Sequence, residues 1–114
     1  MTKLAILALI AALRAVESTN GTDPKAHGND LQITEICIRD VNRIYGTNYK
    51  HPADSRNYKT AREIALLYLN HYGKQKGVPQ TPEAYARIWH RGPTQWRDAQ
   101  GARYWLKVKK YLTK

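Results

Sequence analysis

The sequence predicts a single, almost entirely helical domain. Apolar residues recur at helical spacing in several segments, and residues that favour helix ends delimit those segments. No stretch alternates convincingly between apolar and polar residues, although Asp30 to Thr34 has the composition to pair briefly as a strand. The predicted class is therefore all-α, with at most a minimal β element. A chain of 114 residues buries a core without a disulfide, and its single cysteine, Cys37, is expected to be a buried thiol.

The first predicted helix, Thr2 to Ser18, is apolar on nearly every face, which is typical of a helix surrounded by the rest of its domain. Asn20 and Gly21 are expected to end it. Its apolar run, Leu4 to Leu13, resembles the core of a signal peptide, but it is too short to span a bilayer and no small-residue cleavage site follows it. We therefore expect a core helix rather than a signal peptide or a membrane span. The polar stretch Thr22 to Leu31 should be a surface loop beside the end of that helix.

Two more helices are predicted in the middle of the chain. Residues Thr34 to Tyr45 keep apolar side chains at helical spacing, and Gly46 closes the run. After the irregular segment 47–59, Thr60 and Glu63 form a capping box that should start the third helix. The apolar stripe of this helix consists of Ala61, Ile64, Ala65, Tyr68, Leu69 and Tyr72.

The C-terminal part predicts two further helices. Thr81 as N-cap and Pro82 at the first helical position start a helix through about His90, and Gly92 breaks it. A final basic helix is expected from Asp98 to Leu112. Its inward-facing residues should be Tyr104, Trp105, Val108, Tyr111 and Leu112.

The net charge, together with the absence of metal-binding and phosphate-binding motifs, limits the classes of partner that the protein is expected to bind. Nineteen Lys and Arg against nine Asp and Glu give a net charge of +10, which favours a polyanionic partner such as nucleic acid, an anionic membrane or the bacterial cell wall. The positive charges are spread along the chain, so charge alone does not choose among these partners. The four histidines lack metal-ligand spacing and the chain has no glycine-rich phosphate loop, so no metal and no cofactor are expected.

Glu17 is the best candidate for acid chemistry. Cleaving a glycosidic bond requires a carboxylic acid that is still protonated near neutral pH, and burial against apolar groups raises a carboxyl pKa in that direction. Glu17 stands at the end of the most hydrophobic helix, directly before a polar loop that could form one wall of a cleft. A glutamate near a helix C-terminus is more often solvated, so this position alone does not assign catalysis.

Five segments of the chain resemble, in the same order, motifs of a known superfamily, and one of them contains Glu17. They are Ala15-Val16-Glu17-Ser18, Asp23-Pro24-Lys25-Ala26 with Gly28, Leu31-Gln32-Ile33-Thr34, Ala65-Leu66-Leu67-Tyr68-Leu69, and Tyr85-Ala86-Arg87-Ile88-Trp89-His90-Arg91-Gly92-Pro93. They resemble the Glu-Ser helix end, the following loop, the Gln-Ile pair, the middle helix and the Ala-Tyr-Asn-Ala-Gly-Pro segment of the lytic transglycosylase and goose-type lysozyme superfamily. The resemblance spans nearly the whole chain.

This resemblance implies a lysozyme-like fold with residues 1–114 as one catalytic domain, acting as a monomer on peptidoglycan. Glu17 would be the general acid and then the general base in cleaving the β-1,4 bond between N-acetylmuramic acid and N-acetylglucosamine. Ser18 would help to hold it and is counted among the substrate-binding residues. Gln32 and Ile33 would line the sugar subsite next to the bond that is cut, with Gln32 hydrogen-bonding the substrate or the catalytic carboxylate. Two further expected substrate-binding residues, Trp89 and His90, depart from the family, which usually has Tyr and Asn there, and that Tyr is expected to bond the catalytic Glu.

The reaction outcome depends on a second acid. A two-carboxylate hydrolase needs a partner carboxylate within on the order of 5 to 9 Å, and the candidates are Asp23, Asp30 and Glu35. None of these lies in a recognised motif, so we expect a lytic transglycosylase, in which the substrate's own 6-hydroxyl closes the ring. A hydrolytic muramidase, or lysozyme, with the same acid is the alternative.

A third possibility is a non-enzymatic basic helical module that binds nucleic acid or glycan. Such a binder has no reason to keep Glu17 in a cleft beside Gln32, so the burial of Glu17 discriminates between the two classes. For the enzyme, the small size and the absence of an export signal favour, by analogy, a phage endolysin or virion-associated lysin that another factor releases to the cell wall.

Overall fold

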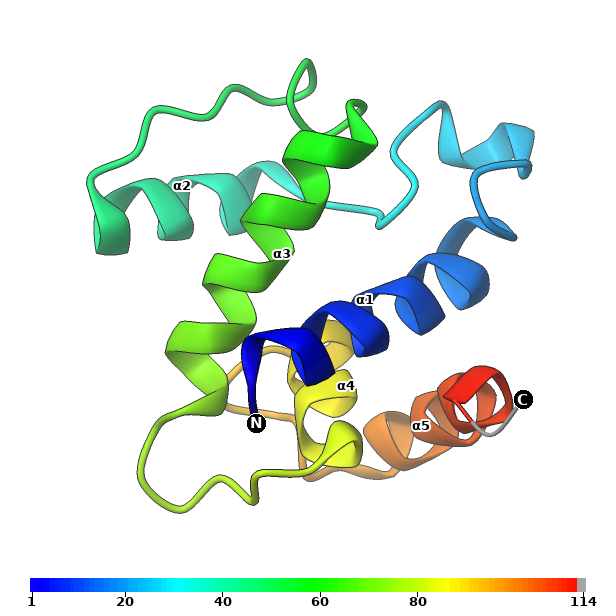
Figure 1. The fold of residues 1–114 in the computed structure, drawn as a ribbon, viewed down its shortest axis with the longest axis vertical. Coiled ribbons are helices and arrows are strands. Elements are labelled where there is room, and N and C mark those ends of the chain that lie inside the picture. Colours follow the sequence, from blue (N-terminus) through cyan, green and yellow to red (C-terminus); the bar gives the residue numbers. More distant parts are fainter. Residues whose placement is uncertain (113–114) are drawn as a thin grey trace.

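The computed structural model describes residues 1–112 and confirms the all-α class. The described residues form five α-helices and one short 3-10 turn, with no strand among them, so the segment 30–34 has no β partner (Figure 1). The elements are α1 (Lys3–Ser18), η1 (Pro24–Ala26), α2 (Glu35–Tyr45), α3 (Tyr58–Gly73), α4 (Pro82–Arg91) and α5 (Ala99–Leu112). No helix within residues 1–112 combines the length and the apolar character that a membrane span requires.

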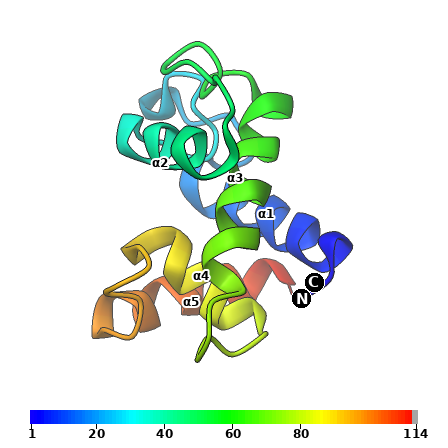
Figure 2. The ribbon, with the colours of Figure 1, turned by 90° about the vertical axis from the view of Figure 1, so that its left-hand side faces the viewer.

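Helix α1 lies at the centre of the fold, but its predicted burial on nearly every face is only partly confirmed, because Leu4, Ala8 and Ala11 are exposed along one side. It contacts α3, α4 and α5, and its side chains Ile6, Leu9, Ile10 and Leu13 have no exposed surface. Figure 2 shows α2 and the irregular segment after it on one side of the molecule and α4 and α5 on the other, with α1 and α3 between them. The C-terminal end of α1 therefore comes to lie near the junction of the two sides.

The end of α1 is a sharp left-handed turn. Thr19, Asn20 and Gly21 all have positive φ, at 51°, 57° and 84°. The N–H of Thr19 bonds to the carbonyl of Ala15 at 3.2 Å, and the N–H of Asn20 bonds to that of Arg14 at 3.3 Å. The predicted stop at Asn20 and Gly21 is thus confirmed, with the turn starting one residue earlier, and the chain reverses direction directly after Glu17.

The loop after α1 is more buried than the sequence predicts. The stretch Thr22 to Leu31 is predicted to lie on the surface, but Ala26, Asp30 and Leu31 are buried. Asp30 is drawn inward because its carboxylate pairs with Arg14, with the guanidinium nitrogen 2.7 Å from Oδ2. This ion pair holds the loop against α1.

One of the two predicted helix caps is confirmed. The hydroxyl of Thr81 accepts from the N–H of Ala84 at 3.2 Å, as predicted. Thr34, for which no cap is predicted, caps α2 by accepting from the N–H of Cys37 at 3.1 Å. The predicted capping box at Thr60 and Glu63 is wrong: α3 begins earlier, at Tyr58, and the side chain of Asn57 accepts from the N–H of Thr60 at 3.2 Å. Asn is as good a cap as Thr, and the earlier start packs Tyr58 against the core.

The inward face of α5 differs from the prediction at one residue. Tyr104 and Val108 are buried as predicted, and Leu112 packs partly against the core. These residues are spaced by four, which keeps them on one face of the helix. Tyr111 is predicted on that face, but its side chain is 43% exposed.

Gly73 offers a test of the packing between α3 and α4. It is buried in the last turn of α3, and a Cβ built there would lie 2.2 Å from Cζ of Tyr85, which is fully buried in α4. Because Tyr85 cannot move without disturbing the core, Gly73→Ala should lower the free energy of unfolding by about 1 to 3 kcal/mol. Thermal or denaturant unfolding measures the change. Asn70→Ala, at an exposed position of the same helix, is the control, and equal stability of both variants would contradict the packing described.

Candidate active site

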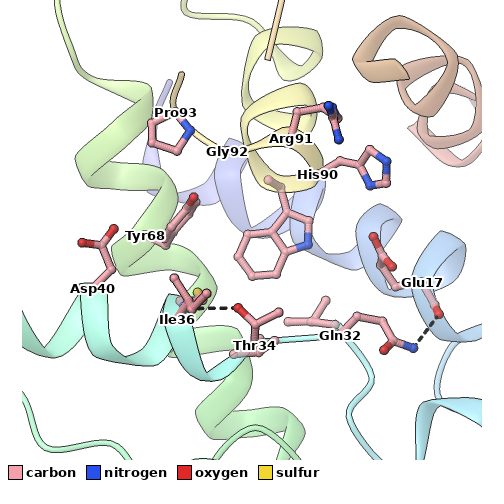
Figure 3. Close-up of a pocket in the computed structure, with 14 residues that line it drawn as sticks. Glu17, Gln32, Thr34, Ile36, Asp40, Tyr68, His90, Arg91, Gly92 and Pro93 are labelled. Atoms are coloured by element: carbon pink, nitrogen blue, oxygen red, sulfur yellow. Dashed lines mark hydrogen bonds between the residues drawn. The ribbon is translucent and has the colours of Figure 1, made fainter. Parts of the chain in front are cut away.

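A cleft of about 460 Å³ opens between the end of α1, the segment 31–34, and helices α2, α3 and α4. Figure 3 shows it with Glu17 and Gln32 at one end and Asp40 and Tyr68 at the other. Its lining residues are Glu17, Leu31, Gln32, Ile33, Thr34, Ile36, Cys37, Asp40, Tyr68, Trp89, His90, Arg91, Gly92 and Pro93.

Five of the residues that the sequence singles out meet in this cleft. They are Glu17, Gln32, Ile33, Trp89 and His90. They come from α1, from the segment before α2 and from α4, so segments far apart in the sequence build one concave surface. Cys37 lies on the same surface, partly buried, and burial raises its pKa to about 12, which keeps it a neutral thiol.

The carboxyl of Glu17 is partly buried and bonded to a phenol. The hydroxyl of Tyr104, from α5, donates to Oε1 of Glu17 at 2.7 Å. Burial raises the pKa of Glu17 above the usual 4.5, while the bond from Tyr104 and the positive charge of Lys107 act in the opposite direction. Burial is the largest of these effects, so Glu17 holds its proton to a higher pH than an ordinary glutamate, as a general acid must.

Tyr104 is a site residue that the sequence places only in the core. Its burial and the neighbouring carboxyl both raise the pKa of its phenol, so it remains a proton donor throughout the physiological range. Its inward position on the last helix is readable from the sequence, but its pairing with Glu17 depends on how α5 packs on α1. Trp89, at the position where the superfamily that the sequence resembles usually has Tyr, sets its ring edge-on to Tyr68, with the ring centroids 5.6 Å apart.

Gln32 bonds the backbone carbonyl of Glu17 rather than its carboxylate. Its amide Nε2 donates to the carbonyl oxygen of Glu17 at 3.4 Å (Figure 3). Gln32 has a φ of 56°, a conformation that a non-glycine residue adopts only when its surroundings impose it. Asn29 supplies that constraint: its side chain bonds both the N–H and the carbonyl of Ile33, at 2.8 and 2.7 Å.

Ser18 does not belong to the cleft. It is fully buried, its hydroxyl donates to the carbonyl of Arg14 at 3.1 Å, and it accepts from the N–H of Gly21 at 2.9 Å. These bonds shape the end of α1 and leave Ser18 without contact to the Glu17 carboxyl or access to a ligand. The assignment of Ser18 to substrate binding is therefore wrong, and its role is to hold the turn that follows Glu17.

None of the three predicted second carboxylates lines the cleft. Asp23 caps the turn η1, accepting from the N–H of Lys25 at 2.9 Å. Asp30 is paired with Arg14, and Glu35 is exposed and paired with Arg39. In this structure the three carboxylates serve helix capping and ion pairing outside the cleft.

Asp40 is the second acidic residue of the cleft, and no motif marks it. Its carboxylate forms an ion pair with Arg43 and accepts a hydrogen bond from Tyr72. It lies on α2 one turn after Ile36, so helical spacing places both side chains on the same face. That spacing is the one signal in the sequence that points to it. Asp40 and Glu17 occupy opposite ends of the cleft in Figure 3.

Among residues 1–112, no group of three or more His, Cys, Asp or Glu side chains is arranged to hold a metal ion. Comparisons of this chain with known protein families, with curated proteins and with solved structures give no match. A function for this chain therefore rests on the chemistry of the cleft and on the motifs that the sequence carries.

The raised pKa of Glu17 predicts a pH-dependent stability difference. A raised folded-state pKa means that the folded protein binds this proton more tightly than the unfolded chain, so the associated stability is complete below pH 4.5 and is lost as pH rises through the folded pKa. The amide introduced by Glu17→Gln is neutral at every pH and can still accept from Tyr104. This variant should therefore match the wild type near pH 4 and be the more stable of the two at pH 7.

Denaturant unfolding at the two pH values measures this difference. Glu35→Gln is the matched control, because Glu35 is exposed, and its effect should stay within about 0.5 kcal/mol at both pH values. A wild type that is more stable than Glu17→Gln at pH 7 would show that burial does not dominate the environment of Glu17.

Proposed function

We propose that this protein cleaves the glycan strands of bacterial peptidoglycan as a lytic transglycosylase, at the β-1,4 bond between N-acetylmuramic acid and N-acetylglucosamine. The observation that carries the proposal is the carboxyl of Glu17, which is buried enough to have a raised pKa and yet lines an open cleft. The sequence motifs around Glu17, Gln32 and Trp89 supply the substrate class.

Tyr104 determines which oxygen of Glu17 delivers the proton. Its hydroxyl donates to Oε1, and an oxygen that accepts this bond serves as the carbonyl oxygen of the neutral acid. Oε2 is then left to carry the transferable proton. After the transfer, the same bond stabilises the new carboxylate, so Tyr104 supports both protonation states that a general acid and base passes through.

In the proposed reaction, Glu17 protonates the glycosidic oxygen and the bond from that oxygen to the anomeric carbon breaks. The acetamido oxygen of the substrate then bonds to the anomeric carbon, which places no demand on a second carboxylate of the protein. Next, the Glu17 carboxylate accepts the proton of the 6-hydroxyl, whose oxygen displaces the acetamido oxygen. The product is a 1,6-anhydro sugar, and no water is consumed.

The remainder of the cleft suits a sugar chain. Trp89, Tyr68 and the 78% exposed Ile36 offer apolar surface for the faces of the rings, and Gln32 and Asp40 offer polar groups for their hydroxyls and amides. The net charge of +10 favours attraction to the anionic cell wall. Access to the wall would follow release by another factor, as for a phage endolysin or virion-associated lysin.

Hydrolysis by the same acid is the second candidate, and the position of Asp40 bears on it. Asp40 lines the cleft, but at the end remote from Glu17 and with its charge engaged by Arg43. This arrangement favours transglycosylation. A module that only binds nucleic acid is disfavoured, because a buried carboxyl in the cleft lowers stability at neutral pH and repels phosphate once it is ionised.

Glu17→Gln is the direct test of the catalytic acid. It keeps the shape of the side chain and removes the transferable proton, so turnover of purified peptidoglycan should fall on the order of a hundredfold or more. Release of soluble muropeptides measures it, with Glu35→Gln as a control of the same chemistry outside the cleft. In the wild type, activity should decline as pH rises through the raised pKa of Glu17. Full activity in Glu17→Gln would refute the proposal.

The products decide between the two reaction outcomes. Mass spectrometry of the digest should show 1,6-anhydro ends, each lighter by one water than a reducing end. Asp40→Asn should reduce binding of the strand without changing the type of end. Reducing ends, together with loss of turnover in Asp40→Asn, would instead assign hydrolysis with Asp40 as the second carboxylate.

A further inference from the structure

We propose that His90 is a positioning residue: its ring, stacked on Tyr104, holds the phenol hydroxyl on the carboxyl of Glu17. This differs from the role that the sequence resemblance gives His90, which is to contact the sugar. The inference deepens the proposed function and rests on it only in so far as Glu17 is the catalytic acid.

The stack is close and parallel. The ring centroids of His90 and Tyr104 are 4.1 Å apart and their planes differ by 4°. The hydroxyl of the same Tyr104 reaches Oε1 of Glu17 at 2.7 Å. Two successive contacts therefore connect α4 to α5 and α5 to α1. A ring covered on one face cannot tilt toward that side, so the stack limits the motion that would break the bond to Glu17.

His90 stands on the cleft side of this pair. It lines the cleft beside Glu17, whereas Tyr104 is only 5% exposed and is not part of the lining (Figure 3). One face of the imidazole is thus taken by Tyr104. The proposed support of the Tyr104 phenol by His90 therefore does not depend on a bound substrate.

The backbone that carries the two rings is itself fixed. Arg91, the neighbour of His90, forms an ion pair with Asp98 at 2.8 Å, just before α5 begins. Arg87, one turn earlier on α4, donates to the carbonyl oxygens of Trp96 and Asp98 at 2.9 and 3.1 Å. These bonds tie the end of α4 to the start of α5, so the two rings keep their register.

The charge state of His90 suits this role. Burial lowers its pKa, and the nearby positive charges of Arg91 and Lys107 lower it further, against a smaller opposing effect of Asp98. The lowered pKa favours the neutral form of the ring. A neutral ring stacks on the phenol without adding a positive charge that would make Glu17 a stronger acid.

A double-mutant cycle on the pKa of Glu17 tests the proposal. The full chain is labelled with ¹³C at its glutamate carboxyls and titrated by NMR without substrate, as wild type, His90→Ala, His90→Phe, Tyr104→Phe and the double variant His90→Ala with Tyr104→Phe. Tyr104→Phe removes the bond that stabilises the carboxylate, so it should raise the pKa of Glu17. His90→Ala should raise it by at least half as much, and His90→Phe, which retains a stacking ring, should keep the wild-type value.

In the double variant, the pKa should equal that of Tyr104→Phe alone, because His90 then has no bond left to protect. His71→Ala, which removes a histidine ring on α3 that packs on Tyr45 and Tyr72, is the control and should leave Glu17 unchanged. An unchanged or lowered pKa in His90→Ala, or shifts that add in the double variant, would overturn the proposal.

Turnover of peptidoglycan provides a second and separable measurement. His90→Ala should lower kcat with little change in KM, and His90→Phe should restore kcat. A raised KM in both variants would mean that the ring nitrogens bind the substrate, which overturns the positioning role. If Glu17→Gln proves fully active while the pKa cycle still shows coupling, the proposed function fails and the support of Tyr104 by His90 stands.

Discussion

The burial of α1 is the constraint on which the rest of the structure depends. Its side chains Leu9, Ile10 and Leu13 have no exposed surface, so α3, α4 and α5 must all pack around it. Glu17 is in the last turn of this helix, and its side chain is partly buried. The same burial that stabilises the domain therefore also withdraws water from one carboxyl at the edge of the cleft.

The environment of Glu17 is a balance between opposing effects. Burial favours the neutral acid, whereas the hydroxyl of Tyr104 and the charge of Lys107 favour the carboxylate. A group that gives up and regains a proton during a reaction must be able to adopt both the neutral and the ionised form. Burial alone would favour only the neutral acid, and the interactions with Tyr104 and Lys107 alone would favour only the carboxylate. The balance lowers stability at neutral pH, and the apolar core offsets this loss.

Helical spacing and end signals predict the helices well, because both are local properties of the chain. The misplaced start of α3 arises where two good caps, Asn57 and Thr60, stand three residues apart and only tertiary packing chooses between them. The site is predictable only in part. Gln32 and Trp89 follow from motif order, but Tyr104 and Asp40 come from helix faces whose neighbours are set by the fold, and Asp30 is engaged in an ion pair that no local pattern signals.

The contacts around Glu17 fall into two groups that differ in the length of chain between the partners. Arg14 and Asp30 are 16 residues apart, and the ion pair between them closes a short loop that contains Glu17. Tyr104 is 87 residues from Glu17. Closing the longer stretch of chain costs more conformational entropy. The acid and one wall of its cleft thus belong to a local unit, and the phenol reaches the carboxyl only when the last helix docks, so the completed site also reports that the chain has finished folding.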